Sequence, residues 1–443
     1  MELHSTCNRM TDTAADRALN TTSEKGEPTM QKRLARVITG TIAACAIWSA
    51  SAMAETSLSF PSYVWTDKID GAWMGSLVDD FEAKNPDVKV SRTPIPFSNM
   101  ADKLFLETTA GQAPDIVTLF DVDVRKYLDA DLLEPLDKYL AEAGIRTDEF
   151  ANAGRQGVKD GHVYAVAWVI NPRALFYNKE IFDKLSLTPP RSKEEFLDAA
   201  RKIKASGLVQ FPMATFAKAG DDNVTFIEFG AILAAFDAAL FRDGTPTADD
   251  PKVLEALSFY KQLFDEGLIP KGLDIGLVRT LFAQGKAAML VGGPFVSGIV
   301  RDADKHVYSN LMSAPYRFSG NSAMSVSIFL GVPKKAKNPD AAAKMLMLML
   351  SDEWQKKVVT GVTSIPLRAN ILPQDFIHDN PWFAAFQQVG LQARSYAPDG
   401  AENLAPEVVK ATATNLEAML FRGKSPEETA KNLQRDLLAL KGK

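Results

Sequence analysis

The stretch that decides the fold runs from Ala110 to Phe120 and reads A-G-Q-A-P-D-I-V-T-L-F. Gly111 and Pro114 interrupt the helical pattern before them, because glycine and proline both disfavour a helix interior. The residues from Asp115 onward are almost continuously apolar, which is typical of a strand buried on both faces. The stretch therefore predicts a helix, a turn and a buried strand in close succession, as in α/β proteins.

The same alternation extends on both sides of this stretch. Strands are predicted over 59–65 and 88–90, with an amphipathic helix over 71–84 between them. The chain beyond Pro339 is mostly helical in pattern. Three later helix starts are marked by capping residues at Ser192, Asp250 and Ser425. The predicted fold class is thus α/β with mostly parallel strands.

Length and composition set limits on the class of protein. The chain has 443 residues, of which 46% are hydrophobic and 24% charged, and its formal net charge is −5. This composition is that of an ordinary globular protein, and the length predicts two or three folding units. The slightly acidic balance offers no footprint for a phosphate backbone, so a nucleic acid partner is not expected.

The N-terminus has the pattern of a secretory signal peptide over 30–54. Basic residues between 32 and 36 precede an apolar run over 37–48, and small residues follow up to Ala54. The run is about half of the ~20 residues that a membrane-spanning helix needs. We therefore expect residues 1–29 to be an upstream extension and cleavage to follow Ala54. A lipid anchor at Cys45 is the alternative.

Several kinds of catalytic or metal site are not expected. Both cysteines, Cys7 and Cys45, fall in the segment that cleavage removes, and the histidines that remain lack metal-ligand spacing. The chain carries no phosphate-binding loop, dinucleotide fingerprint or nucleophile elbow. Asp121 and Asp123 could be read as a glycosidase pair, but alternate residues at a strand end usually face opposite ways. We expect no metal, no cofactor and no enzymatic activity.

Five segments, taken in order, resemble the family 1 extracellular solute-binding proteins, which capture sugars for ATP-binding-cassette (ABC) importers. The first is the strand and helix up to F-E-A-K-N-P-D-V-K-V, and the second is A-G-Q-A-P-D-I-V. The third comprises L-F-Y-N-K-E-I-F and P-P-R-S-K-E-E-F. The last two are L-F-A-Q-G-K-A-A-M-L-V-G-G-P-F and F-L-G-V-P. The five segments lie over 63–90, 110–117, 163–196, 281–295 and 329–333.

The resemblance implies two α/β lobes joined by a hinge, with the ligand held in the cleft between them. The chain is expected to cross the hinge about three times, near 168–173, 323–328 and 363–369. Residues 55–169 and 328–365 would form the N-terminal lobe. Residues 170–327 and 366–443 would form the C-terminal lobe.

The resemblance, together with positions at strand ends and hinge crossings, selects candidate ligand contacts. Aromatic side chains would stack on sugar rings and short polar side chains would bind hydroxyl groups. Phe295 is expected to stack on a sugar ring, because it takes the place of an aromatic residue that follows Gly-Pro in the family. Asn171 stands where members that bind maltose carry an acid. The candidates are Trp65, Asp67, Asp121, Asp123, Trp168, Asn171, Arg173, Phe226, Glu228, Phe229, Gly292, Gly293, Phe295, Ser325, Ser327 and Arg394.

Structural roles remain open for many of these residues. Trp65, Phe226 and Phe229 could belong to the core, and Asp121 and Asp123 could be a solvated helix start. The predicted function is a monomeric periplasmic subunit that captures a sugar or oligosaccharide by hinge closure and delivers it to a membrane permease. The alternatives are a receptor for glycerol phosphate, a sugar acid or a polyamine, and an exported glycoside hydrolase.

Overall fold

The computed structural model describes residues 55–442, apart from 369 and 391. The predicted signal peptide over 30–54, the extension before it and Cys45 lie outside these residues. Within the described part of the chain, no helix is both long and apolar enough to cross a membrane.

One β-sheet is built around β13 (Met324–Gly331). Along one edge, β13 pairs antiparallel with β6 (Ala165–Pro172). Along the other edge it pairs with β14 (Arg394–Ser395) in parallel and with β3 (Val117–Phe120) in antiparallel orientation. Every residue of β6 is buried, as the apolar run over 165–170 favours, and the polar Asn171 near its end is buried with it.

The N-terminal elements lie beside this sheet. Strands β1 (Thr56–Ser62) and β2 (Val88–Pro94) pair in parallel, and α1 (Lys68–Lys84) connects them. Helix α2 (Phe97–Thr109) packs against β3, and α3 (Asp121–Asp129) begins directly after β3. The predicted helix–turn–strand unit around Ala110 to Phe120 is therefore confirmed.

A second β-sheet has the order β12-β7-β11-β8. Strand β7 (Ala174–Asn178) pairs antiparallel with both β12 (Leu311–Ala314) and β11 (Ala287–Gly292). Strand β11 also pairs in parallel with β8 (Phe211–Ala214). The chain passes from the first sheet to the second between β6 and β7, and it returns between β12 and β13.

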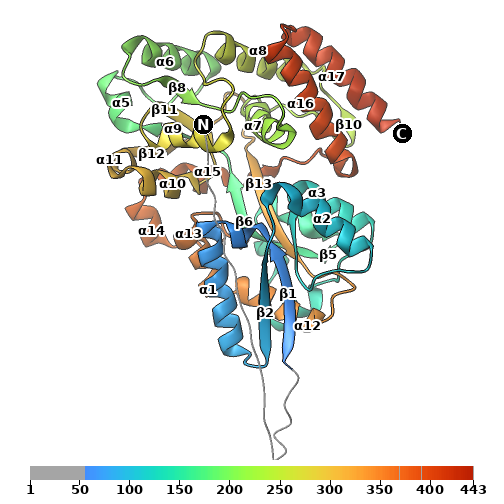
Figure 1. Cartoon of the computed structure of the whole chain (residues 1–443). Coiled ribbons are helices and arrows are strands. Elements are labelled where there is room, and N and C mark those ends of the chain that lie inside the picture. The colour runs from blue at the N-terminus through green and yellow to red at the C-terminus, as the bar shows by residue number, and fades with distance from the viewer. Residues whose placement is uncertain (1–54, 369, 391, 443) are drawn as a thin grey trace, which may run out of the picture. The chain divides into compact units, whose positions relative to one another are not determined.

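Helices α7 (Asp222–Ala235) and α8 (Pro251–Asp265) pack with α16 (Ala405–Phe421) and α17 (Pro426–Lys441), so that C-terminal helices cover segments from the middle of the chain (Figure 1). Their buried side chains form one large apolar cluster with residues of β7 and β11. A second large cluster surrounds β1, β6 and β13.

The described part of the chain contains further α-helices and four further two-residue strands. They are α4 (Asp137–Glu142), α5 (Lys179–Lys184), α6 (Lys193–Ser206), α9 (Ile275–Ala283), α10 (Val296–Ala303), α11 (Lys305–Ser309), α12 (Pro339–Met349), α13 (Asp352–Val362), α14 (Gln374–Asp379), α15 (Ala384–Gly390), and the two-residue strands β4 (Val158–Lys159), β5 (His162–Val163), β9 (Phe241–Arg242) and β10 (Thr245–Pro246).

The three predicted helix starts are confirmed. The side chains of Ser192, Asp250 and Ser425 each accept a hydrogen bond from the first turn of their helix. The prediction of mostly parallel strands is wrong, because β6, β7 and β12 pair antiparallel with their neighbours. Parallel neighbours in one sheet need a crossover between them, whereas the chain enters β7 from the first sheet after the single residue Arg173 and enters β13 from the second sheet after 315–323.

Candidate functional site

Three short segments come together where the chain passes between the two sheets. Ser325 on β13 lies between Pro172 at the end of β6 and Ser395 on β14. Arg173 follows β6 at once, and its backbone N–H donates to the carbonyl of Met324 at 2.8 Å. The strand pairing thus fixes Arg173, Ser325 and Ser395 next to one another.

Charged side chains from three elements converge on Arg173. This residue is only 7% exposed, and burial lowers the pKa of its guanidinium group although Glu228 on α7 opposes the shift. Burial and the charge of Arg173 lower the pKa of Arg279 on α9 to about 10. Burial raises the pKa of Glu228, against the effect of both arginines. Two guanidinium groups therefore share one carboxylate in a poorly solvated place.

Arg279 also contacts an aromatic ring. Its guanidinium carbon lies 5.0 Å from the centre of the Phe295 ring. Phe295 is half-buried and immediately precedes α10, after the Gly-Gly-Pro segment that ends β11. This cation–π contact links the predicted aromatic residue to the buried charges.

Two carboxyl groups in the first turn of α3 face the same region. Burial raises the pKa of Asp121 to about 8, although the Ser395 hydroxyl and the Ser327 N–H both favour its charged form. Burial raises the pKa of Asp123 to about 6, although the positive charge of Lys126 acts to lower it. Asp121 also faces Arg173 closely enough to stabilise its positive charge.

Several buried polar atoms of this region have no hydrogen-bond partner among the residues described. Leaving such an atom unsatisfied costs about 1–3 kcal/mol, so folded proteins rarely tolerate a group of them without a functional reason. Both donors and acceptors are present. They are Oδ2 of Asp121, Oδ2 of Asp123, Nε of Arg173, Oγ of Ser325 and Oγ of Ser327. We call these five residues the hinge cluster.

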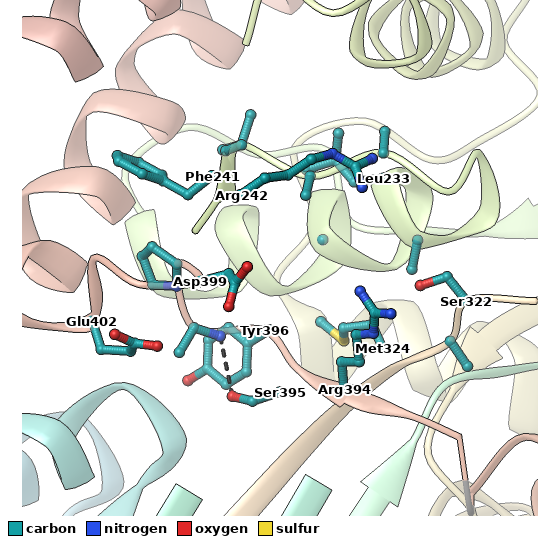
Figure 2. A pocket seen from close by; sticks show the side chains of 18 of the residues that line it. Leu233, Phe241, Arg242, Ser322, Met324, Arg394, Ser395, Tyr396, Asp399 and Glu402 are labelled. Atoms are coloured by element: carbon teal, nitrogen blue, oxygen red, sulfur yellow. Dashed lines mark hydrogen bonds between the residues drawn. The ribbon is translucent and has the colours of Figure 1, made fainter. Parts of the chain in front are cut away.

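A cavity of about 520 Å³ adjoins the hinge cluster (Figure 2). Phe226 on α7 and Tyr396 both line it, with their ring centres 6.0 Å apart. Figure 2 shows side chains of opposite charge around the cavity, with Arg394 near Met324 and Asp399 across from it. Burial, Asp121 and Asp123 raise the pKa of Tyr396, so this lining residue lies close to the two acids. The volume lies within the usual range for small-molecule sites.

Comparison with known proteins assigns the chain to a family. The family model described as bacterial extracellular solute-binding protein matches residues 65–356, which is well over half of the chain. The chain belongs to this family. A putative binding protein of Brucella abortus is 26% identical over 337 residues, with 74% of this chain and 80% of that protein covered. The galactooligosaccharide-binding protein of Bacillus subtilis is 23% identical over 350 residues, with 75% and 79% covered.

A solved structure supports the fold of this solute-binding protein. The GacH receptor of Streptomyces glaucescens superposes with a TM-score of 0.76 at 23% identity, and the match covers 87% of this chain and 98% of the receptor. The predicted two-lobed α/β fold is thus confirmed. The exact lobe boundaries and the three hinge crossings stay predictions.

Some residues that were predicted to bind ligand have other partners in this solute-binding protein. The indole N–H of Trp65 donates to the carbonyl of Phe60 at 2.7 Å. Asp67 is the N-cap of α1 and accepts hydrogen bonds from the N–H groups of Ile69 and Asp70, both at 2.8 Å. Neither arrangement tests the predicted contact of Trp65 or Asp67 with ligand. For Asp67, capping of α1 is the alternative role, and the two roles predict different effects of substitution on sugar affinity.

Other predicted residues lie deeper in the protein. Trp168 is fully buried, with its ring centre 5.6 Å from that of Trp73. Phe229 is also fully buried and stacks on Tyr260. The structure thus brings the predicted residues of the hinge cluster together with Phe226, Glu228, Phe295 and Arg394, and it places Trp168 and Phe229 in the core.

The glycines and Asn171 support the backbone of the site. The side-chain oxygen of Asn171 accepts a hydrogen bond from the Ser364 hydroxyl at 2.7 Å. A Cβ atom at Gly293 would lie 3.1 Å from the Cβ of Asn171, and one at Gly292 would lie 2.9 Å from a methyl group of Val296. Both glycines therefore permit close approach of the segment before Phe295.

Two residues of the site were missed by the sequence reading. Arg279 is the single charged residue of α9, in the sequence I-G-L-V-R-T-L-F-A, and an isolated charge in an apolar helix is a usable signal. Tyr396 follows the two-residue strand β14. So short a strand leaves no periodic pattern in the sequence, and only its pairing with β13 brings Tyr396 to the site.

Proposed function

We propose that this protein is the substrate-binding subunit of an ABC importer and that it captures a sugar or oligosaccharide in the periplasm. The observation that carries the proposal is the hinge cluster, in which unpartnered donors and acceptors lie side by side. A sugar hydroxyl group both donates and accepts hydrogen bonds, so it can satisfy Arg173 and Asp121 at once. The galactooligosaccharide-binding protein among the relatives supports a sugar ligand.

Charge around the site also favours a ligand without a strong net charge. Glu228 and Asp123 oppose the positive charges of Arg173 and Arg279, and Asp121, whose pKa is about 8, adds a mostly protonated carboxyl group at neutral pH. A polyhydroxylated ligand needs such a mixture, whereas a dianion needs an excess of cations. The adjoining cavity of about 520 Å³ adds room for more than one sugar unit.

A receptor for an anionic metabolite is the second candidate. Glu228 is the half-buried carboxylate that opposes the charges of both Arg173 and Arg279, so protonation of Asp121 and Asp123 would leave the site positive. A carboxylate or phosphate group on the ligand would then pair with the arginines. Hydrolysis is less favoured, since the relatives described above are a binding protein and a putative one.

A thermal-shift screen tests the proposal. Neutral sugars, sugar acids, polyols and polyamines are added separately, because a ligand that binds the native state alone must raise the melting temperature. We expect neutral sugars to give the largest shift. Stabilisation by anions alone would support the second candidate, and recovery of shortened oligosaccharides would support hydrolysis.

Capture is expected to work by closure of the two lobes about the hinge. A ligand that contacts both lobes stabilises the closed state through those contacts, and a permease can recognise that state. Small-angle scattering should therefore show a monomer whose radius of gyration falls when a stabilising sugar is added. Superimposable scattering profiles with and without that sugar would contradict closure.

A further inference from the structure

One large apolar side chain is exposed beside the hinge cluster without a role in the proposal above. Phe97, the first residue of α2, is 56% exposed. Its ring centre lies 4.8 Å from that of Phe120 and 5.2 Å from that of Tyr63. The ring is therefore held by two others, unlike the scattered single exposed residues that every protein surface carries. We call Tyr63, Phe97 and Phe120 the aromatic platform.

The aromatic platform lies next to the carboxyl groups of the hinge cluster. Phe120 is the last residue of β3, and Asp121 follows it as the first residue of α3. Helix α2 packs against β3, and its first residue, Phe97, has its ring against that of Phe120 at the end of this strand. Tyr63 is fixed in turn, because its hydroxyl group donates to Asp70 at 2.9 Å.

We propose that Phe97, supported by Tyr63 and Phe120, stacks on the apolar face of a sugar ring whose hydroxyl groups reach Asp121 and Asp123. This inference rests on the proposed function. A pyranose ring presents C–H groups on its faces and hydroxyl groups around its edge, and it therefore needs a flat apolar surface next to polar acceptors. Phe120 of the platform and Asp121 are adjacent in the chain, so both parts of this combination occur at the end of β3.

Phe97 is better placed for stacking than Phe295. The guanidinium group of Arg279 lies over the Phe295 ring, and Phe295 packs against the larger of the apolar clusters. One face of that ring is thus already occupied. Phe97 also discriminates against a small organic acid, because a carboxylate gains little from the electron-rich face of an aromatic ring.

The test compares variants of one helix. Maltotriose and galactobiose are titrated calorimetrically into the wild-type protein, Phe97→Ala, Phe97→Leu and Phe97→Tyr. Leu106→Ala is the matched control, since Leu106 is 66% exposed on the same helix. For the probe that the wild type binds, we expect Ala and Leu to weaken affinity about tenfold and Tyr to keep it within about twofold. Leu106→Ala should match the wild type.

The melting temperature of the free protein provides the second measurement. A surface platform predicts that Phe97→Ala leaves this temperature unchanged, whereas a structural role predicts a clear loss. If the wild type binds a probe and both Phe97→Ala and Phe97→Leu bind it with the wild-type affinity, the platform is overturned and the proposed function stays intact. If neither sugar binds the wild type and anions alone raise its melting temperature, the proposed function fails and the platform fails with it.

Discussion

Two strand ends in this protein carry the same sequence signal and use it differently. After β1 come Trp65 and Asp67, and after β3 come Asp121 and Asp123. The polar groups of the first pair are satisfied locally, by the carbonyl of Phe60 and by the first turn of α1. Each aspartate of the second pair keeps a buried oxygen without a partner among the described residues.

The two strand ends differ because their first aspartates occupy neighbouring but different positions at the start of the helix that follows. Asp67 is the N-cap of α1, where a side-chain oxygen reaches the free N–H groups of the first turn. The N-cap of α3 is Phe120, which has no side-chain acceptor, and Asp121 already lies inside the helix. A polar residue after a strand is therefore a candidate ligand contact only when its side chain does not cap the helix that follows.

The largest expected effect concerns the pH dependence of folding. The pKa of Asp121 is raised to about 8 and that of Asp123 to about 6, while an unfolded chain has a value of about 3.9. At a pH between about 4 and its raised pKa, each group keeps a proton in the folded state that it has released in the unfolded state. Both groups therefore lower the free energy of unfolding as pH rises from about 4 to about 8. We expect the total loss to reach several kcal/mol.

Asp121→Asn should remove most of that loss. Its melting temperature at pH 8 should exceed that of the wild type, and the difference should shrink towards pH 4. Asp67→Asn is the comparison variant, because asparagine caps a helix about as well as aspartate and loss of the Asp67 charge removes only the second cause of the raised pKa of Asp70, after burial. Equal pH profiles for wild type and Asp121→Asn, measured by calorimetry, would show that Asp121 is not the buried carboxyl group described here.

The second prediction concerns sugar affinity in the same two variants. Asp121→Asn keeps an acceptor for the Ser327 N–H but replaces the carboxyl oxygen that has no partner with an NH2 group. Loss of one hydrogen bond to the ligand should weaken affinity about tenfold. Asp67→Asn should bind as the wild type does. Titration calorimetry measures both affinities. Equal affinities for Asp121→Asn and Asp67→Asn would show that the two strand ends do not differ in ligand binding.

The third prediction extends the comparison to aromatic residues. Phe295→Ala should weaken sugar affinity about tenfold, because the change removes the ring that faces Arg279 beside the hinge cluster. Phe229→Ala should instead cost about 3–5 kcal/mol of unfolding free energy, since that ring is fully buried. Urea unfolding beside calorimetric titration separates the two. A large stability loss in Phe295→Ala with unchanged affinity would assign Phe295 to the core.

The smallest effect is expected at the cap of α1. Asp67→Ala removes an acceptor of two backbone hydrogen bonds, which should lower the free energy of unfolding by about 1 kcal/mol. Sugar affinity should not change. Weaker binding in Asp67→Ala and equally in Asp67→Asn would show that Asp67 contacts the ligand as well as the helix.

Much of the fold could be predicted from local patterns. The apolar run after Asp115 that forms β3 and the caps at Ser192, Asp250 and Ser425 depend on neighbouring residues alone. The strand directions could not be predicted, because pairing depends on segments that are distant in the sequence. The predicted strand over 59–65 is also too long, since the Ser62 hydroxyl group accepts from Val64 and starts a 3-10 turn.

The sequence by itself determined the α/β class, the helix starts and the order of motifs that marks the family, because each depends on residues close together in the chain. Only the tertiary structure decided which polar groups are left for a ligand. Arg173, Glu228 and Arg279 come from three separate elements, and Ser325 meets Ser395 through strand pairing. Whether a side chain is satisfied or unsatisfied is a property of its neighbours in space, and those neighbours are chosen by packing.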